Sequence, residues 1–197
     1  FPQDDYAVAR ARLEESAAIG RELGDPAITA YALHFRAMGD LLQEDPETLQ
    51  ALIAEGMALF HEAGDRWGLA TALCTRGMAA IVASQPDTAA AAFAESLALA
   101  RDLGDIWGLA RVLHYSGELA RFRGDDAQAS VLYEESLALG RALGYTRGVA
   151  IVLSDLATVA RERIAAYAGV HPDRVVVGSG ADELIDLLTM TTVDPGD

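Results

Sequence analysis

The chain has 197 residues, of which 51% are hydrophobic, so it can form a sizeable core and is not a disordered polymer. Its net charge is −15, which disfavours a nucleic-acid partner because phosphate backbones require clustered cations. No uninterrupted apolar run approaches the roughly 18 residues of a membrane span, and a single cysteine excludes an internal disulfide.

The first residues of the chain bear on where the protein resides. Residues 1–6 lack the basic and apolar regions of a secretory signal peptide, and one cysteine suits a reducing compartment. We therefore expect a cytoplasmic protein. Because the chain does not begin with Met, we also expect it to be a processed chain or a piece of a longer one.

A helix is predicted over residues 5–23, and the sequence after it repeats with a period of 40 residues. The segment Gly-Asp-x-Trp-Gly-Leu-Ala occurs at residues 64–70 and again at 104–110, and shorter copies begin at Gly24 and Gly144. A fixed period of this size indicates one supersecondary unit copied along the chain, since a single unit cannot bury its apolar face alone.

Each repeat has the pattern of two amphipathic helices. Small residues recur four positions after a leucine, which places the two on one helical face: Ala37, Gly77, Gly117 and Ala157. The second helix of each repeat carries a large residue and, three positions later, a small one: Leu13 and Ser16, Ile53 and Gly56, Phe93 and Ser96, Tyr133 and Ser136. The first helix, residues 5–23, is in phase with this second helix.

Helix ends are predicted by their capping residues. Breaks fall at residues 45–46, 86–87 and 124–126, where proline, glycine and aspartate interrupt the apolar pattern. The repeated glycines occupy positions where a left-handed residue ends a helix. The aspartates that follow, Asp25, Asp65 and Asp105, are placed to cap the next helix.

In these positions the chain resembles the tetratricopeptide repeat family. That family's pattern of a small residue, then alanine, an aromatic and a second small residue is matched by Gly77, Ala89, Phe93 and Ser96. The longer period is similar to repeat arrays in bacterial regulators of the LuxR and AfsR type. The resemblance covers residues 3–160 and implies an all-α solenoid of antiparallel helix pairs, occupying a domain of residues 1–160.

The resemblance also implies a groove lined by the first helix of each repeat, in which a peptide or protein partner binds. Counting from the small positions gives the candidate ligand contacts, which are Tyr31, His34, Met38, Cys74, Met78, Arg111, His114, Glu118 and Arg121. Arginines could hold a carboxylate, whereas methionine and tyrosine at this spacing are also typical of plain core. Trp67 and Trp107 are expected to wedge adjacent repeats together.

No metal site or catalytic group is expected in the repeats. His34, Cys74 and His114 share one repeat position, but stacked helices do not bring three such side chains to one metal ion. The carboxylates at 14–15 and 134–135 are typical of solvated helix faces rather than of an acid/base pair.

Residues 161–197 break the period and form a second segment. A helix ending at Gly169, a β-rich run at 174–177, a glycine-rich turn and a helix at 181–190 resemble the early large-domain segment of histidinol-phosphate aminotransferases. The resemblance implies that the turn, Gly178, Ser179, Gly180, Ala181 and Asp182, descends from one that holds the phosphate of pyridoxal phosphate. Read without it, this is an ordinary strand-to-helix turn.

The chain contains no lysine, so it cannot form the Schiff base of a pyridoxal enzyme, and we expect no enzyme activity and no cofactor. The favoured function is a non-catalytic scaffold for a protein or peptide. The alternatives are a remnant or regulatory fragment of an aminotransferase, or a fusion without evolved function. The tail is expected to stay loose, to cap the last repeat, or to pair two chains as a homodimer through Leu184, Ile185, Leu187 and Leu188.

Overall fold

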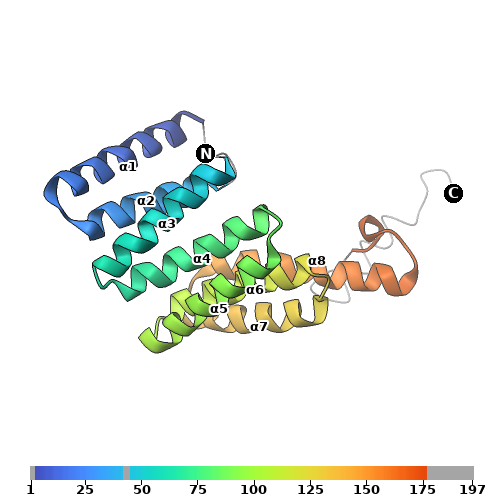
Figure 1. Cartoon of the computed structure of the whole chain (residues 1–197). Helices are drawn as coiled ribbons and strands as arrows, with labels where there is room; N and C mark the ends of the chain where they lie inside the picture. Colours follow the sequence, from blue (N-terminus) through green and yellow to red (C-terminus); the bar gives the residue numbers. More distant parts are fainter. Residues whose placement is uncertain (1–2, 42–44, 177–197) are drawn as a thin grey trace. The chain divides into compact units, whose positions relative to one another are not determined.

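The computed structural model describes residues 3–41 and 45–176, and all regular structure in these residues is helical (Figure 1). The α-helices are α1 (Gln3–Leu23), α2 (Pro26–Asp40), α3 (Pro46–Glu62), α4 (Arg66–Val82), α5 (Pro86–Leu103), α6 (Ile106–Phe122), α7 (Asp126–Ala142) and α8 (Thr146–Ala168). The chain divides into two compact units, Phe1–Gly144 and Tyr145–Asp197. The predicted helical architecture is confirmed, and the predicted domain boundary at 160 falls within α8.

The helices begin at the predicted capping residues. Asp25 Oδ1 accepts hydrogen bonds from the amides of Ala27 and Ile28, which opens α2. In the same way Asp65 Oδ1 accepts from the Gly68 amide at 2.8 Å and opens α4, and Asp105 does so for α6. Each bond satisfies an amide that has no partner within the first helical turn.

The helices end where glycine permits a left-handed backbone. Gly64 has φ +67°, and the next amide, that of Asp65, donates back to the Phe60 carbonyl at 2.9 Å. Gly104 repeats this geometry with φ +64°, and the Asp105 amide donates to the Ala100 carbonyl. A residue with a Cβ would be strained at either glycine. One Gly-Asp pair thus ends a helix and starts the next.

In the first unit, each helix from α1 to α6 packs against the helix that follows it, and the chain reverses direction at each short turn (Figure 1). In addition α2 contacts α4, and α4 contacts α6. The alternate helices α2, α4 and α6 therefore lie against one another as well as against their hairpin partners, so the core continues from one helix pair into the next.

Packing in the α4–α5 and α6–α7 pairs depends on a small residue opposite a ring. A Cβ added to Gly77 of α4 would overlap the ring of Phe93 of α5, and one added to Gly117 of α6 would overlap the ring of Tyr133 of α7. Both rings are at most 2% exposed. The glycines predicted from the period thus let the paired helices approach closely.

The second unit is described as far as residue 176. The helix α8 ends at Gly169, as predicted, where the backbone is left-handed with φ +66°. A single 3-10 turn, η1 (Pro172–Arg174), follows. The β-rich run predicted over 174–177 is wrong for its described part, because Arg174 belongs to η1 and Val175 and Val176 pair with no strand within residues 3–41 and 45–176. Extended residues form a strand only with a neighbour to share hydrogen bonds.

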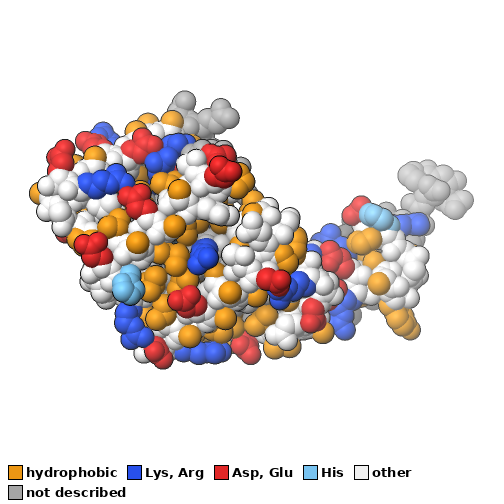
Figure 2. Space-filling model, in the orientation of Figure 1, with side chains coloured by type: hydrophobic (Ala, Val, Ile, Leu, Met, Phe, Trp, Pro, Cys, Tyr) orange, Lys and Arg blue, Asp and Glu red, His pale blue; other side chains and the backbone are white. Residues whose placement is uncertain are grey.

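Within the same described ranges, no helix combines the length and apolarity that crossing a bilayer requires. The acidic and basic side chains of the first unit are interspersed on the face that Figure 2 shows.

Candidate functional site

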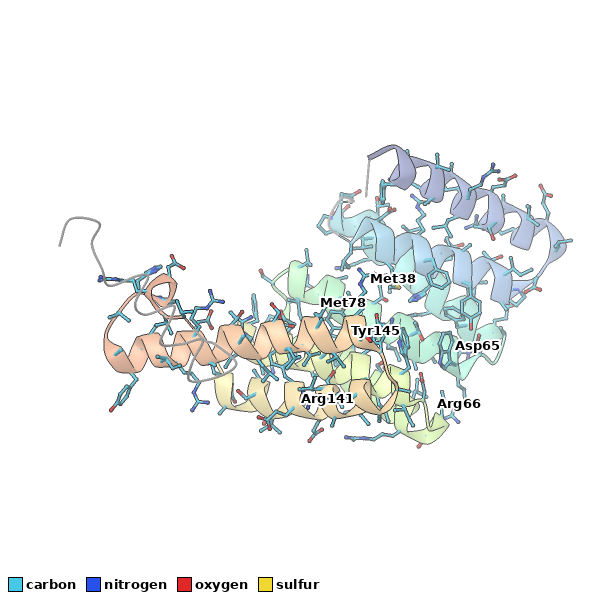
Figure 3. The ribbon with its side chains drawn as sticks, turned by 180° about the vertical axis from the view of Figure 1, so that it is seen from behind. Met38, Asp65, Arg66, Met78, Arg141 and Tyr145 are labelled. Carbon is cyan, nitrogen blue, oxygen red and sulfur yellow. The ribbon has the colours of Figure 1, made fainter. Side chains whose placement is uncertain are left out.

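The nine predicted ligand contacts lie on three helices that touch in sequence. Their positions are Tyr31, His34 and Met38 on α2, Cys74 and Met78 on α4, and Arg111, His114, Glu118 and Arg121 on α6. Because α2 contacts α4 and α4 contacts α6, equivalent positions of neighbouring repeats lie side by side. We call this side of α2, α4 and α6 the A-helix face; Met38 and Met78, which occupy one repeat position, are labelled in Figure 3.

Arg111 links the three helices of the A-helix face. Its Nη2 donates to the Thr71 carbonyl of α4 at 3.3 Å, and its guanidinium carbon lies 4.8 Å from the ring centre of Trp107. Its charge also acts on His34 of α2 and on Cys74 of α4. Within residues 3–41 and 45–176 no carboxylate pairs with Arg111, and its buried Nε has no hydrogen-bond partner there. A half-buried cation therefore faces this surface without a counter-ion.

Two of the predicted contacts are enclosed by the helices. His34 is 3% exposed, with its ring centre 5.3 Å from that of Phe35 and 6.3 Å from that of Phe60. Burial, and to a lesser extent the Arg111 charge, lowers the pKa of His34 to about 4. Cys74 is 1% exposed, and burial raises the pKa of its thiol to about 11. Both side chains are neutral near pH 7 and form the floor beneath the surface.

Tyr31 joins the first module to the second. Its hydroxyl donates to Asp65 Oδ2 at 2.6 Å, while the other oxygen of Asp65 caps α4. Its ring centre lies 4.9 Å from that of Phe60 in an edge-on arrangement and 6.2 Å from that of Trp67. Burial, followed by the hydrogen bond to Asp65, raises the pKa of Tyr31 to about 12. Tyr31 thus holds the face together, and Trp67 of α4 lies beside a ring of the preceding repeat, as expected.

The remaining predicted contacts are partly or fully accessible. Met38 is 37% exposed, whereas Met78 is half-buried. On α6, Glu118 accepts a hydrogen bond from the hydroxyl of Tyr133, and His114 lies with its ring centre 5.8 Å from that of Tyr133. These contacts tie the far part of the face to α7.

Sequence reasoning missed an aromatic side chain on this face. Phe35 is 51% exposed and follows His34 on α2. Trp107 was expected to wedge two repeats, but it packs on Arg111 of its own helix and leaves 39% of its surface exposed. The A-helix face thus carries the exposed apolar groups Phe35, Met38 and Trp107 together with Arg111, which has no carboxylate partner among the described residues.

A separate pocket of about 470 Å³ opens between α3, α4 and the start of α5, and the sequence analysis did not predict it. The lining consists of Gln50, Ile53, Ala54 and Met57 from α3, Arg76, Ala79 and Ala80 from α4, and Gln85 and Thr88 at the start of α5. We call it the α3–α4–α5 pocket. The sequence signal that was missed is a difference between repeats: α3 and α4 lack charged residues that α1 and α2 carry 40 positions earlier.

The predicted phosphate turn, residues 178–182, and the predicted tail helix, residues 181–190, lie outside the described ranges.

Comparison with known proteins bears on a short part of the chain. No protein-family model matches it. A stretch of 37 residues is 51% identical to histidinol-phosphate aminotransferase 2 of Carboxydothermus hydrogenoformans, covering 19% of this chain and 10% of that protein. A stretch of 41 residues is 56% identical to histidinol-phosphate aminotransferase of Methanothermobacter thermautotrophicus, covering 20% and 11%. The chain spans about a tenth of these relatives, and its partial similarity to that family is confirmed.

Proposed function

We propose that the chain is a non-catalytic scaffold that binds a peptide or protein segment on the A-helix face. The observation that carries the proposal is Arg111, a half-buried cation that has no carboxylate partner in the described part of the chain and lies over the partly exposed ring of Trp107. Few charged groups and several large apolar ones are typical of a recognition surface, in which polar groups orient a ligand and apolar groups bind it.

We further propose that α1–α7 form a solenoid of the tetratricopeptide kind. Support comes from contacts that recur 40 residues apart. Ser96 Oγ donates to the Ala70 carbonyl at 2.7 Å, and Ser136 Oγ donates to the Ala110 carbonyl at the same distance. Recurrence of one buried hydrogen bond in consecutive modules is expected when every module packs on the next in the same way.

The chemistry of the face suggests the chemistry of its ligand. A guanidinium without a counter-ion favours a carboxylate, which it can hold through two parallel hydrogen bonds. The net charge of −15 opposes a strongly acidic partner at long range. We therefore propose a largely apolar segment with a single carboxylate, placed over Arg111, and apolar side chains against Phe35 and Met38.

A matched pair of peptide panels tests this proposal. Short apolar peptides that contain one glutamate are compared with the same peptides containing glutamine, and binding is followed by the fluorescence of Trp67 and Trp107, the two tryptophans of the chain. We expect Arg111→Gln to weaken the glutamate peptides about tenfold and to leave the glutamine peptides unchanged. Equal losses in both panels, or no binding at all, would contradict the proposal.

The second candidate function is that of a fragment derived from an aminotransferase, and the 51% and 56% identities favour it. We infer that the similar stretch includes the 161–197 segment, where the sequence pattern of that family was found. This chain contains no lysine, so it supplies no side-chain amine for a pyridoxal Schiff base. After incubation with pyridoxal phosphate and borohydride, mass mapping should find no modified side chain, whereas a covalent adduct on a side chain would overturn the non-catalytic proposal.

A further inference from the structure

The α1–α2 pair contains a buried carboxylate held by cations. Asp40 of α2 is 1% exposed, and its Oδ2 lies 3.2 Å from Arg36 Nε and 4.0 Å from Arg10 Nη1 of α1. The hydroxyl of Tyr6 also donates to Asp40. A second carboxylate, Glu14, lies 3.5 Å from Arg36 Nη1. The space between α1 and α2 is thus filled by a network in which every cation faces an acid.

The equivalent positions of α3 and α4, 40 residues later, retain only one charged residue. Arg36 corresponds to Arg76, whereas Asp40 is replaced by Ala80 and Glu14 by Ala54. The remaining cation of the network, Arg10, corresponds to the neutral Gln50. All four of these residues of α3 and α4 line the α3–α4–α5 pocket. The pocket therefore occupies the place of the charge network, and alanines stand where acids would neutralise its arginine.

Arg76 is left as a cation at the mouth of a cavity. Its side chain is exposed, and no described residue forms an ion pair or a hydrogen bond with its guanidinium. Opposite it, the pocket has apolar walls that include the buried side chains of Ile53 and Ala79 and the half-buried Met57. An anion with a short apolar stem would match both parts.

We propose that the α3–α4–α5 pocket binds a small organic carboxylate, which replaces the acids missing around Arg76. The head group pairs with the Arg76 guanidinium, as Asp40 pairs with Arg36, and the stem lies against Ile53 and Met57. One arginine balances one carboxylate, whereas a phosphate would need further cations, and among the described residues no other basic side chain lines the pocket. The volume of about 470 Å³ suits a small molecule.

Three probes with the same stem and different head groups test the proposal on the whole chain. Hexanoate, hexanol and hexylamine are titrated against protein carrying labelled methionine methyl groups. Met57 lines the pocket, so its resonance should shift with hexanoate and respond at least about tenfold more weakly to hexanol and hexylamine. Equal responses to hexanol and hexanoate, or no response of Met57 to hexanoate, would overturn the proposal.

Two variants locate the binding energy without touching the core. Arg76→Ala removes the cation, and Ala54→Glu supplies an internal acid at the exposed position that corresponds to Glu14. Each should weaken hexanoate binding about tenfold with unchanged helical content, while Arg101→Ala, an exposed arginine outside the pocket lining, should not. Unchanged affinity in both pocket variants would refute the assignment.

A competition experiment identifies the source of the carboxylate, and other methionines separate this site from the A-helix face. If a capped Gly-Glu-Gly peptide displaces hexanoate, the pocket also accepts an acidic side chain of a protein; if it does not, the ligand is a free acid. Met38 and Met78, which lie on the A-helix face, should not respond to hexanoate. The two sites are therefore tested separately: peptides can fail to bind to the A-helix face while hexanoate binds in the pocket, and hexanoate can fail while the peptides bind.

Discussion

Replacing Gly77 with alanine should destabilise the chain, although alanine is the better helix former. The residue lies within α4, and a Cβ there would overlap the ring of Phe93. Phe93 is 2% exposed and belongs to a core cluster that includes Ala89 and Val112. The ring has no route to solvent, so the methyl group must be accommodated by moving α4 away from α5.

Two opposing terms set the magnitude. Alanine in place of glycine inside a helix favours folding by about 1 kcal/mol. Overpacking a filled core costs about 1–3 kcal/mol, and the rigid ring and its enclosed position place Gly77 in the upper part of that range. We therefore expect Gly77→Ala to lower the free energy of unfolding by about 1–2 kcal/mol.

A compensating substitution makes the reasoning specific. Between α2 and α3 the equivalent residues are Ala37 and Ile53, so an extra methyl on one helix accompanies a smaller side chain on the other. In a Phe93→Leu background, Gly77→Ala should therefore be neutral or stabilising. The coupling energy between the two substitutions should reach at least about 1 kcal/mol.

Urea unfolding followed by circular dichroism measures all of these variants. The matched control is Gly56→Ala in α3, where an added Cβ would meet its nearest atoms, the Ala30 carbonyl oxygen and Leu33 Cβ, at 3.7 and 3.8 Å. This control should gain up to about 1 kcal/mol from helix propensity. If Gly77→Ala stabilises the chain as Gly56→Ala does, the close approach of α4 and α5 is not real.

Three further predictions concern single side chains. Because the pKa of His34 is lowered to about 4, between pH 6.5 and 4 the unfolded chain binds a proton that the folded chain excludes. The free energy of unfolding should therefore decrease as the pH is lowered through this window, by up to about 3 kcal/mol. Urea titrations of His34→Gln should show a smaller decrease. Asp65→Ala should lower the free energy of unfolding by about 2 kcal/mol, more than Tyr31→Phe at about 1 kcal/mol, because Asp65 also caps α4; equal losses would contradict the double role. Cys74, the single cysteine, should react with a thiol reagent in urea but resist it in the folded chain, and rapid native labelling would show that it is not buried.

Helix ends and helix pairing were predictable because they obey local rules. Asp65 caps α4 and Gly64 ends α3 through interactions that span only a few residues, so their positions follow from the order of side chains alone. The close packing at Gly77 and Phe93 also follows a pattern in the sequence, since a fixed period places a small residue in the first helix and a large one in the second helix of each repeat.

Accessibility could not be predicted in the same way. His34 and Met38 were assigned to one face by counting, yet His34 is 3% exposed and Met38 is 37% exposed. The difference arises because Phe60 of α3 packs over the His34 ring, and a helical period does not specify how far a neighbouring side chain reaches. The β-rich run failed for a related reason, since Val175 and Val176 have β propensity but no described strand beside them.

The candidate sites lie where the modules stop resembling one another. Positions that keep their character through the period, such as Ser96 and Ser136, make the same buried contact in each module and so build the array. Positions that change do not: Asp40 and Glu14, which neutralise Arg36, are replaced by Ala80 and Ala54, so Arg76 faces a cavity. A stacked array needs its repeated contacts for stability, so substitutions that create a ligand site are tolerated only at positions outside them. Comparing each module with its neighbour therefore locates candidate sites within one chain, and in this chain it selects Arg76 and its pocket.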